Sequence, residues 1–135
     1  MNLEPNAQKL RYSKQREQIY KYLLNSKEHP SADMIYKGLF NDVPNLSLAT
    51  VYRNLRLLEE LGKIQCVAIA DNAERYDARC DVHAHFVCTK CGAVKDLDSI
   101  DMEGVKNFCS LGDRVSITGI KLVIDGLCEN CIHDN

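Results

Sequence analysis

Histidines and cysteines are concentrated in HAHFVCTKCG, a short stretch of this 135-residue chain that runs from His83 to Gly92. Its two cysteines form a C-x-x-C pair, and a second C-x-x-C pair follows after an interval of 36 residues. Each pair can form a tight turn that directs two thiolates towards one ion, and two such turns complete a tetrahedral zinc site with Zn–S distances of about 2.3 Å. The four predicted zinc ligands are Cys88, Cys91, Cys128 and Cys131.

Two other interpretations of the cysteine pairs stay open at this point. A C-x-x-C pair is also the pattern of a thiol–disulfide redox centre, and cysteines can be buried simply as packing residues. Gly92 after the first pair and Gly126 before the second favour the metal site, because glycine suits tight turns. A site closed by four thiolates has no free coordination position, so we expect a structural zinc ion that stabilises the fold.

The two histidines of the stretch indicate a separate site. His83 and His85 are two residues apart in a probable strand and should project on one face, whereas Cys88 has the opposite parity and should point to the other. Four residues are candidates to complete the histidine site: His29, Asp77, Asp81 and Asp96. Imidazole and carboxylate together suit Fe²⁺, Mn²⁺ or Zn²⁺. The alternative is a pair of solvated surface histidines.

Three cysteines fall outside the two pairs: Cys66, Cys80 and Cys109. We expect them to be packing residues rather than ligands, although Cys80 lies close to the histidines and could react. His133 lies in a charged tail and is expected to be solvated.

Short helices and a hairpin should position the first half of these residues. Each of three expected helices begins after a serine cap: Ser13, Ser31 and Ser47. The apolar residues that the first helix should bury are Ile19, Leu23 and Leu24. Gly62 stands where the residue just after the end of the third helix is expected, and the strand-like runs IQCVAIA and ERYDA then flank a turn at Asp71-Asn72. Three helices followed by a hairpin are the order of a winged helix.

The third helix, LATVYRNLRLLEEL, has two expected faces. Its core-facing stripe is Leu48, Val51, Leu55 and Leu58. The opposite face carries no acidic residue and offers the expected DNA contacts: Thr50, Tyr52, Arg53 and Arg56. Lys14 and Arg16 of the first helix are expected to meet phosphates. A solvated surface is the alternative for each basic residue, and Arg56 has Glu59 and Glu60 within reach for pairing.

The second half of the chain changes character near Ala78. Its expected elements are two strands, a helix and one long strand or two, in the order HAHFVC, AVKDLD, DMEGVKNFCSL and RVSITGIKLVIDG. We therefore predict an α+β protein of two domains. An N-terminal winged helix-turn-helix domain should span residues 1–78, and a small C-terminal α/β domain should span residues 79–135.

Charge is unevenly distributed along the chain, although the net charge is only −2. Residues 1–63 carry ten Lys and Arg against seven Asp and Glu, and residues 64–135 carry seven against twelve. A basic first half is suited to a polyanion. No apolar run approaches the roughly 20 residues that span a bilayer, and the N-terminus lacks a signal-peptide pattern. We expect a cytoplasmic protein without membrane partners, in which cysteines are more often thiols or metal ligands than disulfides.

The chain resembles the ferric uptake regulator superfamily of bacterial metalloregulatory repressors, from about Arg11 to Cys131. The motifs that carry the resemblance are EHPSADMIY, SLATVYRNLRLLEELG, RYD and HAHFVCTKCG. Within the superfamily the chain is most similar to the peroxide-sensing branch. This similarity rests on Asp77 and Asp96, which stand where the iron-sensing branch typically has glutamates.

The resemblance implies a repressor that dimerises through its C-terminal domain and binds a double-stranded DNA operator as a homodimer. It implies a structural Zn²⁺ at the four cysteines and a regulatory Fe²⁺ or Mn²⁺ held by His29, Asp77, His83, His85 and Asp96. It further implies that peroxide is the signal: reaction at bound Fe²⁺ would oxidise His29 or His83, after which the repressor leaves DNA.

Three alternatives compete with this hypothesis. The nearest is an iron- or zinc-responsive repressor of the same family that does not sense peroxide. A zinc hydrolase is a second, but five protein ligands leave little room for a catalytic water, so we expect no enzyme. A metal-delivery protein is a third, and the acid-free face of the third helix favours DNA binding over it.

Overall fold

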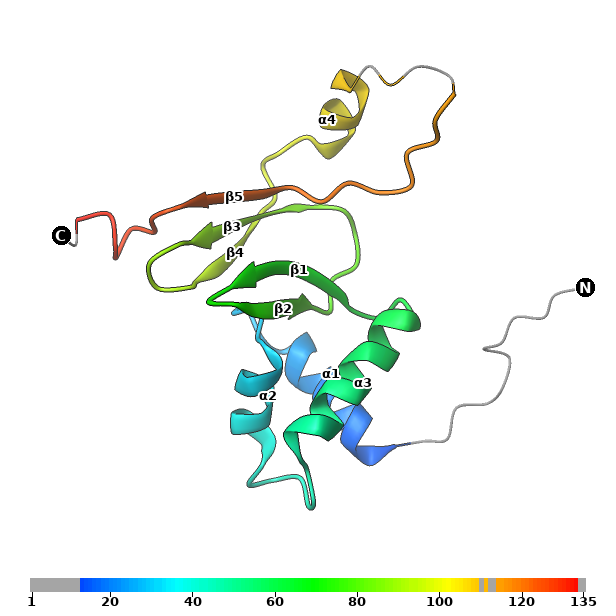
Figure 1. The fold of residues 1–135 in the computed structure, drawn as a ribbon, viewed down its shortest axis with the longest axis vertical. Coiled ribbons are helices and arrows are strands. Elements are labelled where there is room, and N and C mark those ends of the chain that lie inside the picture. Colours follow the sequence, from blue (N-terminus) through cyan, green and yellow to red (C-terminus); the bar gives the residue numbers. More distant parts are fainter. Residues whose placement is uncertain (1–12, 110, 112–113, 134–135) are drawn as a thin grey trace, which may run out of the picture.

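The computed structural model describes residues 13–109, 111 and 114–133 (Figure 1). Arg11, where the family resemblance begins, and Ser110, near the end of DMEGVKNFCSL, lie outside the described residues, as do the two ends of the predicted domains. Three helices form one end of the molecule, a hairpin lies in the middle, and a three-stranded sheet with a fourth helix forms the other end (Figure 1). The predicted α+β class is confirmed.

Three helices begin at the serine caps that the sequence predicts. They are α1 (Lys14–Leu24), α2 (Ala32–Leu39) and α3 (Leu48–Glu60). In each case the serine hydroxyl accepts a hydrogen bond from the backbone N–H three residues later, at 3.1–3.3 Å. Gly62 follows α3 with a φ of +74°, which is the left-handed backbone that ends many helices.

One face of each helix packs into a common core. The core residues of the helices include Ile19, Leu23, Ile35, Leu39, Val51, Leu55 and Leu58. Leu24 is exposed, contrary to the sequence prediction, because it lies about 100° around α1 from Leu23 and cannot face the same core. Leu48 is also exposed, since the packed face of α3 begins only one turn later, with Thr50 and Val51.

Thr50 is a second correction on α3. Its side chain is 8% exposed, so it does not share the exposed face of the helix with Tyr52. The Thr50 hydroxyl lies 2.9 Å from that of Ser47, and its carbonyl accepts a hydrogen bond from the Asn54 amide at 3.0 Å. The polar atoms of Thr50 are therefore used in contacts with Ser47 and Asn54 in the first turns of α3.

The hairpin consists of β1 (Gln65–Ala70) and β2 (Ala73–Asp77), which pair antiparallel. Asp71 and Asn72 form its turn with φ values of +52° and +60°, as two-residue turns of this kind require. Tyr76 of β2 joins the helical core, and its backbone N–H donates to the carbonyl of Pro30 at 3.1 Å. The predicted winged-helix order is confirmed.

The second sheet holds β3 (Ala84–Cys88), β4 (Val94–Leu97) and β5 (Val123–Gly126). β3 lies in the middle, antiparallel to β4 and parallel to β5. The helix α4 (Met102–Phe108) lies at the far end (Figure 1).

The long strand predicted over RVSITGIKLVIDG is wrong before Val123. Both edges of β3 are already occupied by β4 and β5, and β3 is only five residues long. Val123 pairs with His85 near the start of β3, so among the described residues 114–122 lie beyond the part of β3 that could pair with them, although the carbonyl of Leu122 accepts from the backbone N–H of His85. In the described part of the chain, no helix combines the length and apolar character that a membrane crossing requires.

Candidate metal centres

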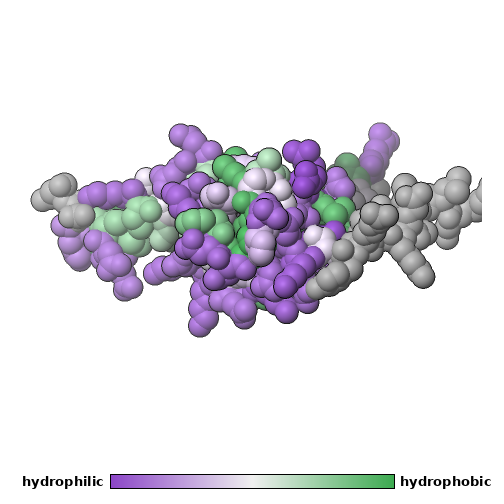
Figure 2. Space-filling view, turned by 90° about the horizontal axis from the view of Figure 1, so that it is seen from below, coloured by the Kyte–Doolittle hydropathy of each residue, from purple (hydrophilic) through white to green (hydrophobic). Residues whose placement is uncertain are grey.

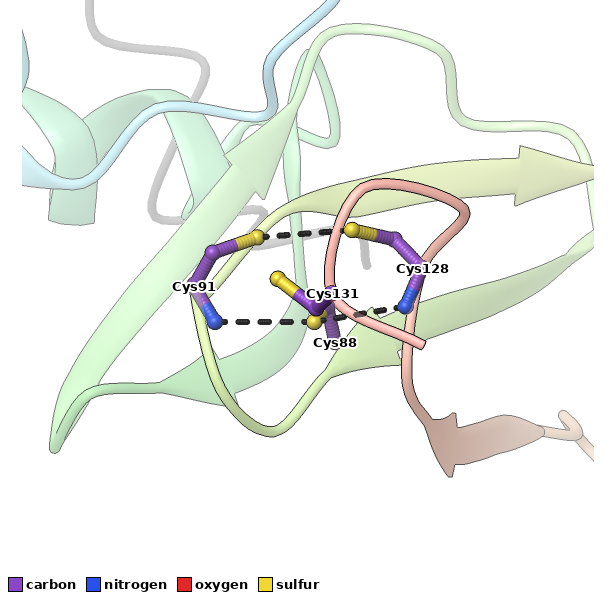
Figure 3. A group of neighbouring side chains, drawn as sticks. All are labelled: Cys88, Cys91, Cys128 and Cys131. Carbon is purple, nitrogen blue, oxygen red and sulfur yellow. Dashed lines mark hydrogen bonds between the residues drawn. The ribbon is translucent and has the colours of Figure 1, made fainter. Parts of the chain in front are cut away.

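The four cysteines of the two C-x-x-C pairs converge at the end of β3 (Figure 3). Their Sγ atoms all lie within 4.8 Å of one another, and the distance from Cys91 Sγ to Cys128 Sγ is 3.8 Å. A tetrahedral zinc site with Zn–S distances of about 2.3 Å has sulfur–sulfur edges of about 3.8 Å. The donor set and its spacing therefore fit a zinc ion held by four thiolates.

Backbone N–H groups in this cluster stabilise the thiolate form of one cysteine. The N–H groups of Cys91 and Cys128 point to Cys88 Sγ at 3.5 and 3.4 Å, and these hydrogen bonds lower the pKa of the Cys88 thiol to about 6. The neighbouring Cys128 sulfur raises the pKa of the Cys131 thiol to about 12. The cluster thus favours one thiolate but resists several, and a divalent cation would offset their mutual repulsion.

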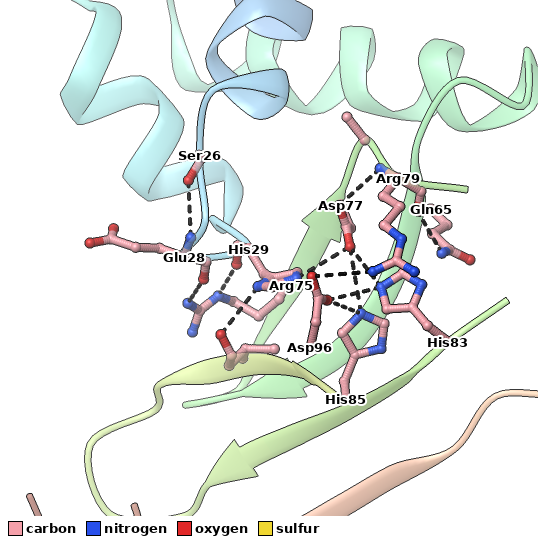
Figure 4. Close-up of polar contacts among 12 residues, drawn as sticks. Ser26, Glu28, His29, Gln65, Arg75, Asp77, Arg79, His83, His85 and Asp96 are labelled. Atoms are coloured by element: carbon pink, nitrogen blue, oxygen red, sulfur yellow. Dashed lines mark hydrogen bonds and ion pairs between the residues drawn. The ribbon is translucent and has the colours of Figure 1, made fainter. Parts of the chain in front are cut away.

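A second cluster gathers five side chains between the helices and the second sheet (Figure 4). They are His29, Asp77, His83, His85 and Asp96, and one ligand atom of each lies within 4.8 Å of all the others. His29 comes from the loop between α1 and α2, and Asp77 ends β2. The other three come from the chain entering β3, from β3 itself and from β4.

Two carboxylate oxygens lie at the centre of this cluster. Asp96 Oδ1 is 2.8, 2.9 and 3.2 Å from the Nε2 atoms of His29, His83 and His85. Asp77 Oδ2 is 3.2, 3.1 and 3.6 Å from the same three nitrogens. Three imidazoles and two carboxylates therefore direct one atom each at a common point.

Hydrogen bonds on the far side of two rings fix their tautomers. His29 Nδ1 lies 3.1 Å from the carbonyl oxygen of Val94, and His83 Nδ1 lies 2.8 Å from that of Asp81. A carbonyl oxygen only accepts, so each Nδ1 must carry the proton. In the neutral ring Nε2 then presents its lone pair to the cluster, as a metal-binding histidine does.

His85 provides the test of whether this cluster fits a cation. Its Nε2 is buried and has no hydrogen-bond partner among the described residues, because its 3.2 Å approach to Asp96 Oδ1 lacks hydrogen-bond geometry. A buried polar atom left without a partner costs about 1–3 kcal/mol. A divalent cation at the common point would remove that cost, and the mixed nitrogen and oxygen set suits Fe²⁺, Mn²⁺ or Zn²⁺.

Opposing effects act on the pKa values of the cluster. Burial lowers the pKa of His29, but hydrogen bonds with Asp77 and Asp96 outweigh burial and leave it raised. Burial raises the pKa of Asp77, but hydrogen bonds from His29 and the Arg79 backbone hold it well below its usual range. Burial and the neighbouring His83 and His29 lower the pKa of His85. The cluster therefore keeps Asp77 anionic and His85 neutral, which are the forms that bind metal.

Residues 7–124 match the sequence profile of the Ferric uptake regulator family. This chain belongs to that family. The peroxide-responsive repressor PerR of Staphylococcus saprophyticus is 34% identical over 122 residues, which cover 90% of this family member and 82% of the relative.

Two solved structures of ferric uptake regulator relatives have the same fold. The Helicobacter pylori ferric uptake regulator, described with three functional metal binding sites, gives a TM-score of 0.77 at 26% identity, covering 90% of this chain and 82% of that one. The Campylobacter jejuni peroxide stress regulator gives a TM-score of 0.72 at 30% identity, covering 87% of this chain and 88% of that one.

In this ferric uptake regulator family member, the strand parity argument correctly separates the histidines from the cysteines. Of the four residues considered for the histidine site, Asp81 lies outside the cluster, because its two carboxylate oxygens accept from the Arg79 guanidinium at 2.6 Å. His133 is exposed, as predicted. Cys80 and Cys109 are exposed too, so the expectation that they pack in the interior is wrong, and Cys66 is half-buried.

Two arginines that lie beside the second cluster of this family member were not predicted from the sequence. The Arg79 backbone N–H donates to Asp77 Oδ1 at 2.9 Å, which leaves Oδ2 facing the histidines. The Arg79 guanidinium also pairs with Asp98 at 2.6 Å and lies 3.8 Å from Asp96 Oδ2. Arg75 lies in the RYD motif, in which the sequence predicted a role only for Asp77. Its guanidinium donates to the backbone carbonyls of Glu28, His29 and Gly92.

The helical end of this family member is predominantly hydrophilic (Figure 2). On α3, Tyr52, Arg53 and Arg56 are exposed, and the first turn carries no acidic residue. On α1, Lys14 is exposed and Arg16 is half-buried. Except for Thr50, the residues predicted to contact DNA are thus at least partly accessible.

Proposed function

We propose that this chain is a metal-dependent transcriptional repressor that releases DNA in response to peroxide. The observation that carries the proposal is the mixed origin of the second cluster. His29 belongs to the helical half, whereas His83, His85 and Asp96 belong to the second sheet, and all of them direct one atom at a common point. A metal bound there would join the two proposed domains, residues 1–78 and 79–135.

The regulatory mechanism follows from this joint. Five residues would hold Fe²⁺ or Mn²⁺, and by doing so would restrain the helical half against the sheet. In a homodimer, that orientation sets the spacing of two α3 helices, which must match operator half-sites about 34–36 Å apart or a multiple of that distance. Metal occupancy then changes DNA affinity by shifting the population towards the competent orientation. The four cysteines would hold a structural Zn²⁺ that supports the dimerisation domain.

The exposed face of α3 provides the first test. Replacing Arg53 with alanine should weaken operator binding by about 1–3 kcal/mol, or roughly 5- to 150-fold, because an exposed guanidinium at the start of a recognition helix can contact a base or a phosphate. Fluorescence anisotropy with Mn²⁺-loaded protein at several salt concentrations measures the effect. Lys121→Ala, which removes an exposed positive charge outside α3, is the matched control. An unchanged operator affinity of the Arg53 variant would indicate that the exposed face of α3 is not the DNA-binding surface.

Access to the second cluster supports the peroxide part of the proposal. A cavity of about 460 Å³ opens beside the cluster and is lined by His29, Asp77 and Asp96. It is large enough to admit a small molecule such as hydrogen peroxide. Fe²⁺, if bound, would activate the O–O bond for cleavage. In the net reaction the imidazole of His29 or His83 would supply two electrons and gain one oxygen atom, and the other oxygen atom would leave as water.

Peptide mass spectrometry tests this chemistry directly. After peroxide treatment of Fe²⁺-loaded protein, a peptide containing His29 or His83 should gain the mass of one oxygen atom, and the Mn²⁺-loaded protein should stay unmodified. Unmodified histidines together with oxidised cysteines would indicate a thiol switch instead. Metal-dependent DNA binding that peroxide does not change would identify an iron- or zinc-responsive repressor.

A further inference from the structure

Arg75 of β2 is a buried arginine whose guanidinium binds three backbone carbonyls (Figure 4). Its Nε donates to the carbonyl of His29, its Nη2 donates to that of Glu28 at 2.7 Å, and its Nη1 donates to that of Gly92 at 2.7 Å. A buried charge is tolerated only when its donors are satisfied. Here three of the five N–H donors are bound by two segments that lie far apart in the sequence.

The first of these segments holds His29 in an unusual backbone conformation. His29 has a φ of +53°, in the left-handed region that residues other than glycine seldom adopt. Such a conformation costs of order 1–3 kcal/mol and persists only where the surroundings enforce it. Arg75 supplies the contact to the His29 carbonyl, and the Val94 carbonyl holds the ring from the other side. The direction of His29 Nε2 therefore depends on Arg75.

The second segment is the turn of the cysteine cluster. Gly92 directly follows Cys91 and has a φ of +77°. The backbone N–H of Gly92 donates to the Cys88 carbonyl at 2.9 Å, so this turn and the first cysteine pair form one unit. The guanidinium is planar and presents its donors in a fixed fork. One rigid group thus joins the turn of the cysteine cluster to the loop that carries His29.

We propose that Arg75 is a positioning residue that holds His29 in the regulatory site and ties it to the Cys91–Gly92 turn, so that the two metal clusters are coupled. The proposal rests on the proposed function only in that the five-residue cluster must bind Mn²⁺. Its consequence is that displacing the turn at Gly92 weakens Mn²⁺ binding, even though Gly92 contributes no ligand to either cluster.

A double-mutant cycle tests the contact to His29. Calorimetric titration of zinc-loaded full-length protein with Mn²⁺ should show a dissociation constant at least tenfold weaker for Arg75→Met than for the unmodified chain. In a His29→Ala background, Arg75→Met should add less than a twofold change, because the ligand that it positions is already gone. Arg114→Met, which removes an exposed arginine, should leave the dissociation constant unchanged. An equal loss in both backgrounds would overturn the proposal, since it would show that Arg75 acts independently of His29.

Gly92→Ala tests the tie to the cysteine cluster. A Cβ at Gly92 would lie 2.4 Å from Asp71 Oδ2, which can rotate away, but the φ of +77° strains any residue other than glycine, so we expect the turn to shift while all four cysteines remain. We expect several-fold weaker Mn²⁺ binding from Gly92→Ala in the unmodified chain and no further change in the Arg75→Met chain, with zinc content constant in both. The same loss in both chains would refute the coupling.

Two further outcomes are distinguishable from these. If His29→Ala alone leaves Mn²⁺ binding intact, the proposed function fails rather than the role of Arg75. If Arg75→Met does not fold, Arg75→Lys replaces it in the tests with His29→Ala and Gly92→Ala. Lysine keeps the charge but can satisfy only part of the three-carbonyl contact. The visible spectrum of bound Co²⁺ should then report an altered ligand set for Arg75→Lys, and an unaltered spectrum with unchanged affinity would count against the proposal.

Discussion

Replacing Cys128 with serine is expected to remove zinc from the purified protein and to unfold the second sheet. Cys128 is buried, and it anchors the chain after β5 to the end of β3. The apolar core shared by the hairpin and this sheet is small: Val67, Ala68, Ala70, Val87 and Val94. A structural zinc ion contributes apparent binding free energies of about 10–16 kcal/mol in small domains. Its loss should therefore exceed what this core can compensate.

Metal analysis and thermal unfolding measure this effect. Zinc should fall from about one ion per chain to background, and the midpoint of unfolding should drop by more than about 10 °C, since a loss of 1 kcal/mol alone shifts it by several degrees in a domain of this size. Cys109→Ser provides the control, because Cys109 is an exposed cysteine outside the cluster. A Cys128→Ser protein that keeps its zinc and its stability would show that the cluster is not a four-thiolate site.

Replacing His85 with leucine is expected to abolish Mn²⁺-dependent DNA binding without destabilising the metal-free protein. The two effects separate because His85 Nε2 is buried without a hydrogen-bond partner among the described residues. Leucine fills about the volume of the imidazole and removes the unsatisfied polar atom, so the substitution should not cost stability. Removing a ligand should weaken Mn²⁺ binding by more than about 100-fold, beyond the losses typical of residues that only support a ligand.

Three measurements define the outcome for His85. Calorimetric Mn²⁺ titration and operator mobility shifts should both show the loss, while the unfolding midpoint of metal-free protein stays within about 2 °C of the unmodified chain, as expected for a change below 1 kcal/mol. His133→Ala, at an exposed histidine, should change none of them. If the metal-free His85→Leu protein is strongly destabilised while still binding Mn²⁺, His85 is a packing residue and the cluster is not a metal site.

Local chemistry made much of the fold predictable from the sequence. The three serine caps and the Asp71-Asn72 turn depend on residues within a few positions of one another, and all of them are found where expected. Strand parity is equally local, which is why it separated His83 and His85 from Cys88 before any tertiary contact was known. The approach of His29 to the second sheet is a long-range contact: residue type made His29 only one of four candidates, and the family resemblance selected it.

The features that escaped prediction depend on the approach of distant segments. Arg75 binds backbone carbonyls that lie 17 to 47 residues away. Every residue has such a carbonyl, so residue type does not reveal which of them accept from Arg75. The burial of Thr50 and the exposure of Leu48 depend on where α3 begins to pack, which helical periodicity alone does not determine. Likewise, residues 114–122 have strand propensity but form no strand, because they lie beyond the start of β3.

The parallel pairing of β3 with β5 has a consequence for how the protein is made. All five residues of the histidine cluster precede Leu97, whereas the cysteine cluster is complete only at Cys131, close to the end of the chain. Ribosomes add about 5–20 residues per second, and domains generally fold in the order of synthesis. For a few seconds of each synthesis cycle, Cys88 and Cys91 are therefore a half-built site with two open coordination positions. The ligand set of the histidine cluster is thus complete before that of the cysteine cluster.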